Sequence, residues 1–217
     1  MNEIIENGYL IHWYNLRDDI ESEYLEWLHS EYIPARLTDP RVLWACHFKS
    51  LTNVEHPGEM GRLSHDNKSI PAGDRYILIF GSENPETFAN PTVAEYHQSL
   101  SQNAERPLDG SGLSECIQVG NFNSGSAGDE DELASWYATW RIPSMRKLPG
   151  CQGVRKLVSI SGWAKHAILY EWSSPDARNS TFVDHELANP EMEAWTDRVD
   201  RKLVHAPGSP NLAVRIW

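Results

Sequence analysis

Short apolar runs of strand length alternate along the chain with longer stretches in which apolar residues recur every three or four positions. These two spacings are typical of β-strands with buried faces and of amphipathic helices. In the first half, the strand-like runs are 9–16, 42–49 and 75–82, and the helix-like stretches are 20–37 and 89–100. In the second half, strands are expected at 116–122, 154–160, 166–172 and 211–217, and helices at 130–148 and 188–199.

The first helix of each half carries a related sequence. YLEWLHSEYIPARL begins at Tyr24, and LASWYATWRIPSMR begins at Leu133. The matching pairs are Trp27 with Trp136, Ile33 with Ile142 and Pro34 with Pro143. The second helix of each half opens with the same triplet, Ala-Asn-Pro. This internal repeat predicts two copies of one supersecondary unit.

The order strand, helix, strand, strand, helix, strand is that of the ferredoxin-like split βαβ unit. Strands such as YILIF, which begins at Tyr76, are apolar on both faces and must be covered on both sides. We therefore expect an α+β fold in which two ferredoxin-like βαββαβ units pack sheet to sheet as an α+β barrel. The first unit is expected at 1–110, with a long loop at 50–74, and the second at 111–217. Residues 103–115 are predicted to be a linker, so the closing strand of the first unit is not placed.

The order of elements, the tandem copies and the two first helices that end in W-x-x-x-x-x-I-P resemble the dimeric α+β barrel superfamily, especially its EthD-like members. EthD-like chains often carry an H-x-P motif on this helix after a tryptophan. Here the histidine position of that motif holds Tyr32 in the first copy and Arg141 in the second. The resemblance implies proton-transfer chemistry on a small molecule. The superfamily also includes cofactor-free oxygenases and haem-degrading barrels.

Composition and charge narrow the class of partner. The formal net charge of −12 is spread along the chain without a basic stripe, which argues against a nucleic-acid partner or an anionic membrane surface. The first residues lack the basic start and apolar run of a signal peptide, and no long apolar window is present, so a cytoplasmic protein is expected. Phosphate-loop, dinucleotide, serine-hydrolase and zinc-peptidase motifs are absent, and we expect no cofactor and no metal.

A helical-wheel projection of the first helix, with 100° per residue, indicates a candidate site. Tyr24 and Trp27 then fall on the apolar side, Glu31 falls near the middle of that side, and His29 points to solvent. A carboxylate in an apolar pocket has a raised pKa and can act as a general acid or base near neutral pH. The alternative is that Glu31 pairs with an arginine or reaches water. Tyr32, beside this stripe, is a candidate hydrogen-bond donor to a ligand.

The same stripe in the second copy is fully apolar. Trp140 stands where the first copy has Glu31, and the other members of the stripe are Leu133, Trp136 and Tyr137. We therefore expect this helix to pack against its sheet and the first copy to keep a pocket. A weaker candidate cluster in the second copy consists of His166, Tyr170, Trp172 and Arg141.

Two histidines lie on strands that should be neighbours in the first sheet. If His12 and His47 share a face, one imidazole can act as a base and the other can orient it. Satisfied core or edge histidines are the alternative. Trp13 and Trp44 lie next to them in the sequence and would line the helix side if the histidines faced the other sheet. The loop at 50–74 is long enough to act as a lid.

The leading hypothesis is a cofactor-independent acid/base enzyme of the dehydratase, decarboxylase, cyclase or isomerase type that acts on an apolar, aromatic small molecule. The catalytic candidates are Glu31, His12, His47 and Tyr32, and the substrate-binding candidates are Trp13, Tyr24, Trp27 and Trp44. The alternatives are a non-catalytic small-molecule binding or stress-associated protein, a haem-binding protein and a cofactor-free monooxygenase. A homodimer is compatible with the expected fold.

Overall fold

One antiparallel sheet organises the chain. The computed structural model describes residues 6–51, 73–88, 112–187 and 189–217. Its strands are β1 (Gly8–Tyr14), β2 (Val42–Ser50), β3 (Tyr76–Ser82), β4 (Cys116–Asn123), β5 (Cys151–Val158), β6 (His166–Trp172), β7 (Val204–His205) and β8 (Asn211–Arg215). They follow the order β1-β3-β2-β8-β4-β6-β5, and the short β7 pairs with β4.

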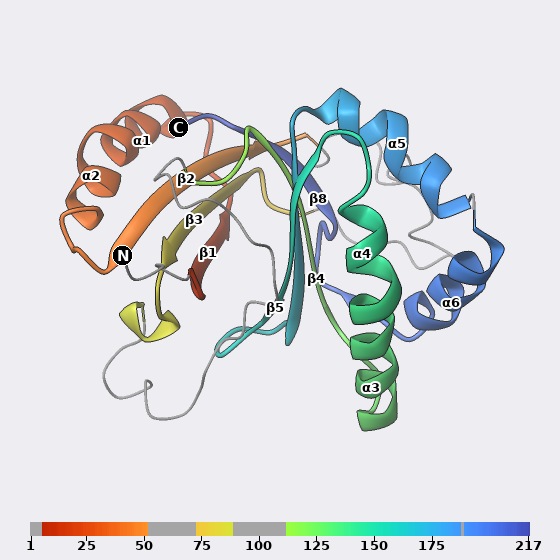
Figure 1. Cartoon of the computed structure of the whole chain (residues 1–217). Helices are drawn as coiled ribbons and strands as arrows, with labels where there is room; N and C mark the ends of the chain where they lie inside the picture. The colour runs from red at the N-terminus through yellow and green to blue at the C-terminus, as the bar shows by residue number, and fades with distance from the viewer. Residues whose placement is uncertain (1–5, 52–72, 89–111, 188) are drawn as a thin grey trace, which may run out of the picture.

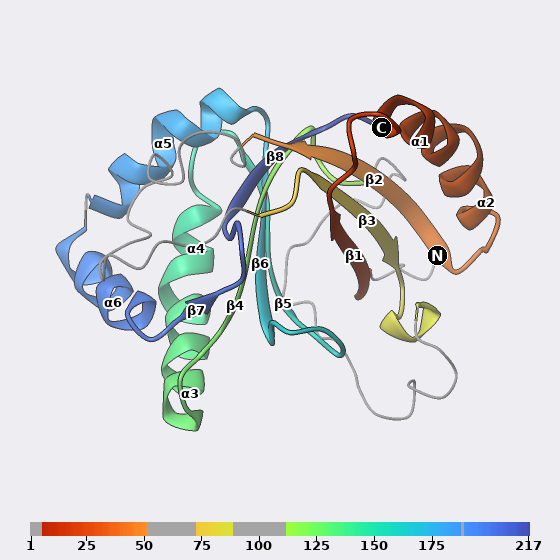
Figure 2. The same cartoon turned by 180° about the vertical axis from the view of Figure 1, so that it is seen from behind.

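Helices cover the two outer faces of this sheet. They are α1 (Glu21–Trp27), α2 (Ile33–Arg36), α3 (Ala127–Trp136), α4 (Ile142–Met145), α5 (Pro175–Leu187) and α6 (Pro190–Asp200). The sheet curls so that the N-terminal strands β1, β3 and β2 face the C-terminal strands (Figures 1 and 2). The helices α1 and α2 lie outside the N-terminal strands, and α3 to α6 lie outside the C-terminal ones. Because β8 pairs with both β2 and β4, it joins the two groups of strands.

The α+β class and the antiparallel sheet are confirmed. The strands expected within the described residues are present with small shifts at their ends. The sequence pattern did not predict α5 or β7, and each expected first helix is interrupted. The helix expected at 89–100 and most of the loop expected at 50–74 lie outside the described residues.

Buried apolar side chains fill three regions. Between the two layers of strands lie Trp44, Phe48, Ile79, Ile117, Leu169 and Ala213. Beneath α1 and α2 lie Leu28, Ile33, Ala45, Leu78 and Phe80. Beneath α3 to α6 lie Leu133, Trp136, Met145, Tyr170 and Trp172. The strands are therefore apolar on both faces because both faces are covered, as the runs without alternation predicted.

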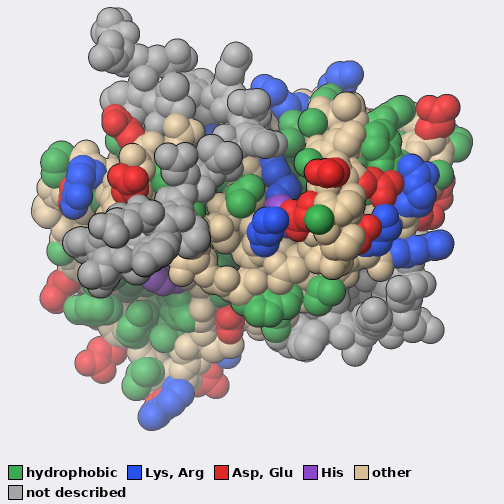
Figure 3. All heavy atoms as spheres, turned by 90° about the horizontal axis from the view of Figure 1, so that it is seen from below, with side chains coloured by type: hydrophobic (Ala, Val, Ile, Leu, Met, Phe, Trp, Pro, Cys, Tyr) green, Lys and Arg blue, Asp and Glu red, His purple; other side chains and the backbone are tan. Residues whose placement is uncertain are grey.

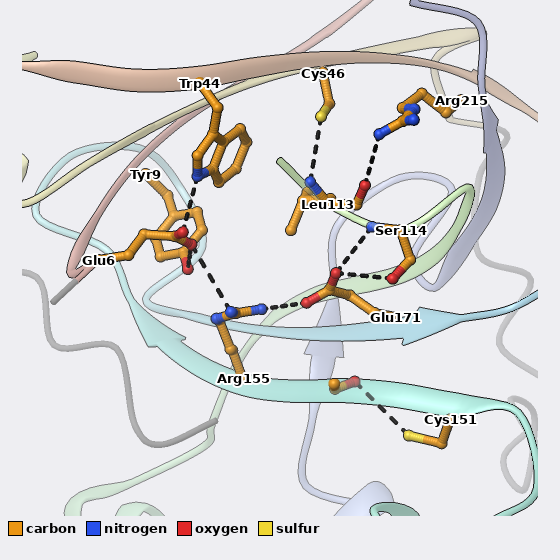
Figure 4. Close-up of polar contacts among 11 residues, drawn as sticks. Glu6, Tyr9, Trp44, Cys46, Leu113, Ser114, Cys151, Arg155, Glu171 and Arg215 are labelled. Carbon is orange, nitrogen blue, oxygen red and sulfur yellow. Dashed lines mark hydrogen bonds and ion pairs between the residues drawn. The ribbon is translucent and has the colours of Figure 1, made fainter. Parts of the chain in front are cut away.

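A charged cluster is buried between the two layers (Figure 4). Arg155 on β5 forms an ion pair with Glu171 on the neighbouring β6, and both side chains are 3% exposed. The same guanidinium lies 3.9 Å from Oε1 of Glu6, which precedes β1 on the other layer. The indole of Trp44 donates a hydrogen bond of 2.8 Å to Glu6. The cluster thus links opposite layers through a cation held between two carboxylates.

Neighbouring polar groups complete this cluster. The backbone N–H of Ser114 donates to Oε2 of Glu171 at 2.9 Å, and its hydroxyl donates to the same oxygen at 3.1 Å. The phenol of Tyr9 donates to Glu6. A buried charge is tolerated only when it is paired and hydrogen-bonded, and removal of one partner leaves the other uncompensated.

Replacement of Arg155 with Met is expected to lower the free energy of unfolding by about 3–5 kcal/mol, because it leaves two buried carboxylates without their shared cation. Urea denaturation at neutral pH measures this change. Arg146, which is exposed, provides the matched control: its replacement with Met should change the stability by less than about 0.5 kcal/mol. Adding Glu171→Gln to Arg155→Met should restore part of the loss. Equal stability of the two single variants would contradict a role for this cluster in joining the layers.

Candidate functional site

Both first helices contain a widened turn directly before an Ile-Pro pair. A π-helical turn at Leu28–Tyr32 separates α1 from α2, and a second one at Tyr137–Arg141 separates α3 from α4. Pro34 and Pro143 each lack a backbone N–H, and a proline ring clashes with the carbonyl four residues earlier in an α-helix. A π-turn accommodates such an interruption and places one more residue in the turn.

The widened turn changes which side chains of the first helix face the sheet. His29 is half-buried and points to the sheet, whereas Glu31 is exposed. The predictions that Glu31 faces the sheet and that His29 faces solvent are therefore wrong. A regular 100° wheel failed because the π-turn displaces the positions after Leu28. The wheel also assigned Ile20 and Trp27 to the buried side because they are apolar, but each side chain is 40% exposed.

Three neighbouring strands project polar aromatic rings toward this helix. On β1, Tyr14 lies opposite Tyr76 of β3, and on β2, His47 lies opposite Leu78 of β3. Leu78 belongs to the core beneath α1 and α2, so this face is the helix side. His12 also lies opposite Leu78 and therefore shares the face of His47. The strand β3 separates the two histidines, and His12 is exposed.

The buried imidazole of His47 is hydrogen-bonded at both nitrogens. Its Nε2 lies 2.7 Å from the hydroxyl of Tyr14, and its Nδ1 lies 2.8 Å from Nε2 of His29. The ring of His47 is stacked on that of Tyr14, with centroids 5.8 Å apart, and lies 5.4 Å from the ring of Tyr76. The side chains of His29, His47 and Tyr14 thus form a continuous chain from a half-buried imidazole to a phenol.

The environment keeps this chain uncharged. Burial, with a smaller contribution from His29, lowers the pKa of His47 to about 3. Burial also lowers the pKa of His29 and raises that of Tyr14, to which Tyr24 and Tyr76 add. At neutral pH the site therefore contains two neutral imidazoles and a neutral phenol. Neutral imidazoles can accept protons, whereas imidazolium ions cannot.

Aromatic rings surround the outer end of this chain. The indole of Trp217 stacks on His29, with centroids 6.3 Å apart, and is 37% exposed. On the helix, Trp27 contacts Tyr24 at 5.4 Å and Tyr32 at 5.3 Å between centroids. Partly exposed aromatic walls beside a few polar groups are typical of sites for flat ligands.

A carboxylate closes the other end of the cluster. Glu21, at the start of α1, accepts a hydrogen bond from the phenol of Tyr76 and forms an ion pair with Arg75 at 2.5 Å. Burial and this carboxylate together raise the pKa of Tyr76 to about 12. Glu21 therefore replaces Glu31 as the acid that faces the sheet.

Trp13 and Trp44 were expected to line the helix side only if the histidines faced the other sheet, and the histidines face the helix. Trp44 is buried between the two layers, and Trp13 packs against the same core. They face away from His47 because successive residues of a strand point to opposite faces. Tyr14 was missed, although its even spacing from His12 in the sequence places it on the same face.

In the second half, the weaker predicted cluster separates into two groups. Arg141 Nε donates to the hydroxyl of Tyr170 at 3.0 Å, and its guanidinium lies 4.9 Å from the centroid of Phe182. Trp172 belongs to the same core and lies 6.1 Å from Phe182 between ring centroids. His166 contacts Glu130 instead. Leu133, Trp136 and Tyr137 are buried, so the packed stripe expected there is confirmed at these positions.

Metal-ligating side chains do not cluster among the described residues. These residues contain no group of three or more His, Cys, Asp or Glu side chains that can hold a metal ion. The buried imidazoles on the helix sides, His47 and His166, each have both ring nitrogens in hydrogen bonds with protein atoms. Neither presents a nitrogen to an iron in this arrangement.

Surface features agree with the charge pattern of the sequence. On the face shown in Figure 3, acidic and basic side chains are interspersed with hydrophobic ones. Across the described ranges, every helix is too short or too polar to cross a membrane.

Comparison with known proteins supports the fold. No family model and no curated protein sequence matches the chain. Among solved structures, a protein named as a chlorite dismutase aligns over 98% of this chain and 96% of its own, with 11% identity and a TM-score of 0.58. A protein named as a monooxygenase of Fusobacterium nucleatum aligns over 99% of this chain and 93% of its own, with 9% identity and a TM-score of 0.54. An anthrone oxidase-like protein aligns over 100% of this chain and 93% of its own, with 11% identity and a TM-score of 0.54. At 9% to 11% identity, these alignments show a shared fold.

These neighbours correct the functional hypothesis drawn from the sequence. They are named for oxidative reactions, which contradicts a lyase or isomerase. The structure adds a physical reason, because Glu31, the carboxylate on which that mechanism depended, is exposed. An exposed carboxylate lies in water and not in the apolar pocket that the mechanism required.

The pH dependence of stability tests the buried, neutral state of His47. Its pKa of about 3 in the folded protein lies below its ordinary value of 6.5, so the unfolded chain binds the proton first as the pH falls. The stabilisation is complete above about pH 6.5 and is lost as the pH falls toward 3. Between pH 7 and 5, this histidine should cost the wild type about 2 kcal/mol of unfolding free energy.

Replacement of His47 with Gln should remove that part of the pH dependence, and urea denaturation at the two pH values measures it. His12→Gln, at an exposed position on the same face, is the matched control and should change the dependence less. Identical pH dependence in the wild type and His47→Gln would show that His47 is not buried in the neutral form.

Proposed function

We propose that the chain is a cofactor-free oxidase or monooxygenase of a small, flat aromatic compound that carries an acidic C–H or O–H. The observation that supports this most is the uncharged chain His29–His47–Tyr14, which ends beneath exposed aromatic rings. The neighbouring structures named as a monooxygenase and as anthrone oxidase-like agree with this class of reaction.

The proposed chemistry begins with removal of a proton from the substrate. An aromatic carbanion or phenolate is electron-rich enough to pass electrons to O2 without a metal or flavin. For a methylene group between two aromatic rings, the methylene and one O2 become a ketone and one molecule of water. The carbanion adds O2, the resulting peroxide anion takes up a proton to give a hydroperoxide, and loss of water leaves the ketone. The protein must therefore supply a base and then return a proton.

In this proposal His29 is the base. Its Nε2–H donates to Nδ1 of His47, and Nε2–H of His47 donates to the oxygen of Tyr14. This arrangement leaves Nδ1 of His29 as an acceptor, with no hydrogen bond from the described residues. His47 and Tyr14 are positioning residues, because the hydrogen bond at one imidazole nitrogen decides which tautomer the other nitrogen presents.

The rings of Trp27, Tyr24 and Trp217 are proposed to hold the flat substrate. Trp217 stacks on His29. A ligand ring that stacks on Trp217, or that takes its place, would bring an acidic C–H near Nδ1 of His29. The ligand is thus an apolar aromatic molecule, as the sequence predicted for the partner. Tyr32, whose ring lies 5.3 Å from that of Trp27, and His12 keep secondary roles as candidates.

We also infer that the chain is a tandem pair of ferredoxin-like units, at 1–110 and 111–217, of the EthD-like kind. The order β8-β4-β6-β5 in the C-terminal half supports this, because it is the order 4-1-3-2 of a split βαβ unit. Both halves also place a glutamate of the first helix against the third strand: Glu21 with Tyr76, and Glu130 with His166.

Anthrone is a suitable probe substrate, with O2 uptake and anthraquinone formation as the measured quantities. Replacement of His29 with Gln is expected to lower kcat by about 10²-fold or more, because it removes the general base. His47→Gln should lower kcat less and shift the pH profile, since it disturbs only the tautomer of His29. Glu31→Gln, on the same turn but exposed, is the matched control and should keep wild-type turnover.

Wild-type turnover in His29→Gln would overturn the assignment of the base. Quenching of tryptophan fluorescence by anthrone, without any O2 uptake in the wild type, would show a binding protein instead of an oxidase. Loss of quenching in Trp27→Leu would place that ligand on the first helix.

A further inference from the structure

The C-terminal half contains a buried amine at the position that corresponds to His47. His47 lies opposite Leu78, the third residue of β3, and Lys156 lies opposite Ile168, the third residue of β6. Lys156 is 4% exposed, and its ammonium position lies 5.6 Å from the ring centroids of both Phe122 and Tyr137. Buried lysines are rare unless they are paired or functional.

Two further side chains connect Lys156 to the surface. Its Nζ lies 2.7 Å from Nδ1 of His166, and Nε2 of that imidazole lies 2.8 Å from Oε2 of Glu130. Glu130 is held by an ion pair of 2.7 Å with Lys165, whose side chain is 55% exposed. An amine in contact with an imidazole, which a carboxylate orients in turn, is the arrangement that activates nucleophiles in enzymes.

The hydrogen bonds suit an uncharged amine. A neutral amine has two hydrogens, and Lys156 has two acceptors, namely His166 Nδ1 at 2.7 Å and the carbonyl oxygen of Leu157 at 3.2 Å. Its lone pair then remains available to an electrophile. A charged ammonium would have a third hydrogen and would stand between two aromatic rings without a carboxylate in direct contact among the described residues.

The electrostatics agree with this geometry. Burial, opposed by Glu130 and assisted by Lys165, lowers the pKa of Lys156 to about 7. Burial also lowers the pKa of His166, as does Lys156. Burial disfavours the charged form of Glu130, but hydrogen bonds from Lys165, Ser124 and His166 lower its pKa to about 2. At pH 7 to 8 the cluster therefore holds an ionised carboxylate, a neutral imidazole and an amine of which about half or more is uncharged.

We propose that Lys156, His166 and Glu130 form a second reactive centre in which the amine of Lys156 adds carbon dioxide reversibly to form a carbamate. The lone pair of Nζ attacks the carbon, an N–C bond forms, and one C=O electron pair moves to oxygen. One N–H proton passes to Nδ1 of His166. The product is a carbamate anion beside an imidazolium ion, which Glu130 stabilises, so the net charge of the cluster does not change.

Carbon dioxide is the electrophile that fits this centre. Lys156 and His166 are 4% and 7% exposed, which excludes bulky carbonyl compounds in the described conformation. Carbon dioxide is small and apolar, and it reacts only with uncharged amines. This site is independent of the His29 site, because it lies on the other half of the chain beneath α3.

Equilibration of the full chain with 13C-labelled bicarbonate and CO2 at pH 7.5, followed by trapping with triethyloxonium and peptide mass spectrometry, tests the proposal. The expected result is a 13C ethyl carbamate on Lys156 and little on Lys147, an exposed lysine outside this cluster. Replacement of His166 with Gln should slow the appearance of the adduct by about 10²-fold, because it removes the proton acceptor. Lys147→Met should leave the adduct on Lys156 unchanged.

The wild-type measurement alone decides the proposal, even if a variant fails to fold. An adduct on the amino terminus with none on Lys156 would overturn it. Equal labelling of Lys156 and Lys147 would also overturn it, because the amine would then have no special reactivity. Since the readout is the adduct itself, its absence would say nothing against the oxidase function of the first half.

Discussion

The fold depends on a cation held between two carboxylates in the middle of the molecule. Arg155 and Glu171 belong to one layer of strands, and Glu6 comes from the segment that begins the other. The surrounding core is apolar, so the ion pair and the hydrogen bonds of this cluster compensate charges that are withdrawn from water. Burial of the charges fixes the register of one layer on the other, whereas aliphatic side chains alone tolerate sliding. This central contact therefore also sets the positions of the helices, which pack on the outer faces of the two layers.

A second constraint, the Ile-Pro pair on each first helix, decides what those helix faces present to the sheet. Because Pro34 cannot continue the α-helix, the turn before it widens, and His29 comes within 2.8 Å of His47. Without the extra residue, His29 would lie on the solvent side of a regular helix. The candidate base therefore depends on a helix irregularity. Such irregularities are frequent at functional sites.

The strands were largely predictable from the sequence because both of their faces are buried and the apolar runs mark them directly. The missed helix α5 has a mostly polar sequence, in which Phe182 is a buried member. Its start signal was nevertheless present, since Ser174 caps the backbone N–H of Ala177 and Pro175 opens the helix. The site was less predictable. An ideal wheel cannot show a π-turn, and no local pattern brings Glu6 to Arg155 across most of the chain.

The two halves show how one scaffold supports different acid/base chemistry. Each first helix contributes a glutamate to the first residue of the third strand, as Glu21 does for Tyr76 and Glu130 for His166. A phenol with a pKa of about 12 holds its proton at neutral pH, whereas an imidazole can accept one. The buried neighbour differs accordingly: His47 has both nitrogens engaged, and the amine of Lys156 keeps a lone pair free. Different side chains at equivalent positions thus distinguish the proposed positioning residue His47 from the proposed nucleophile Lys156.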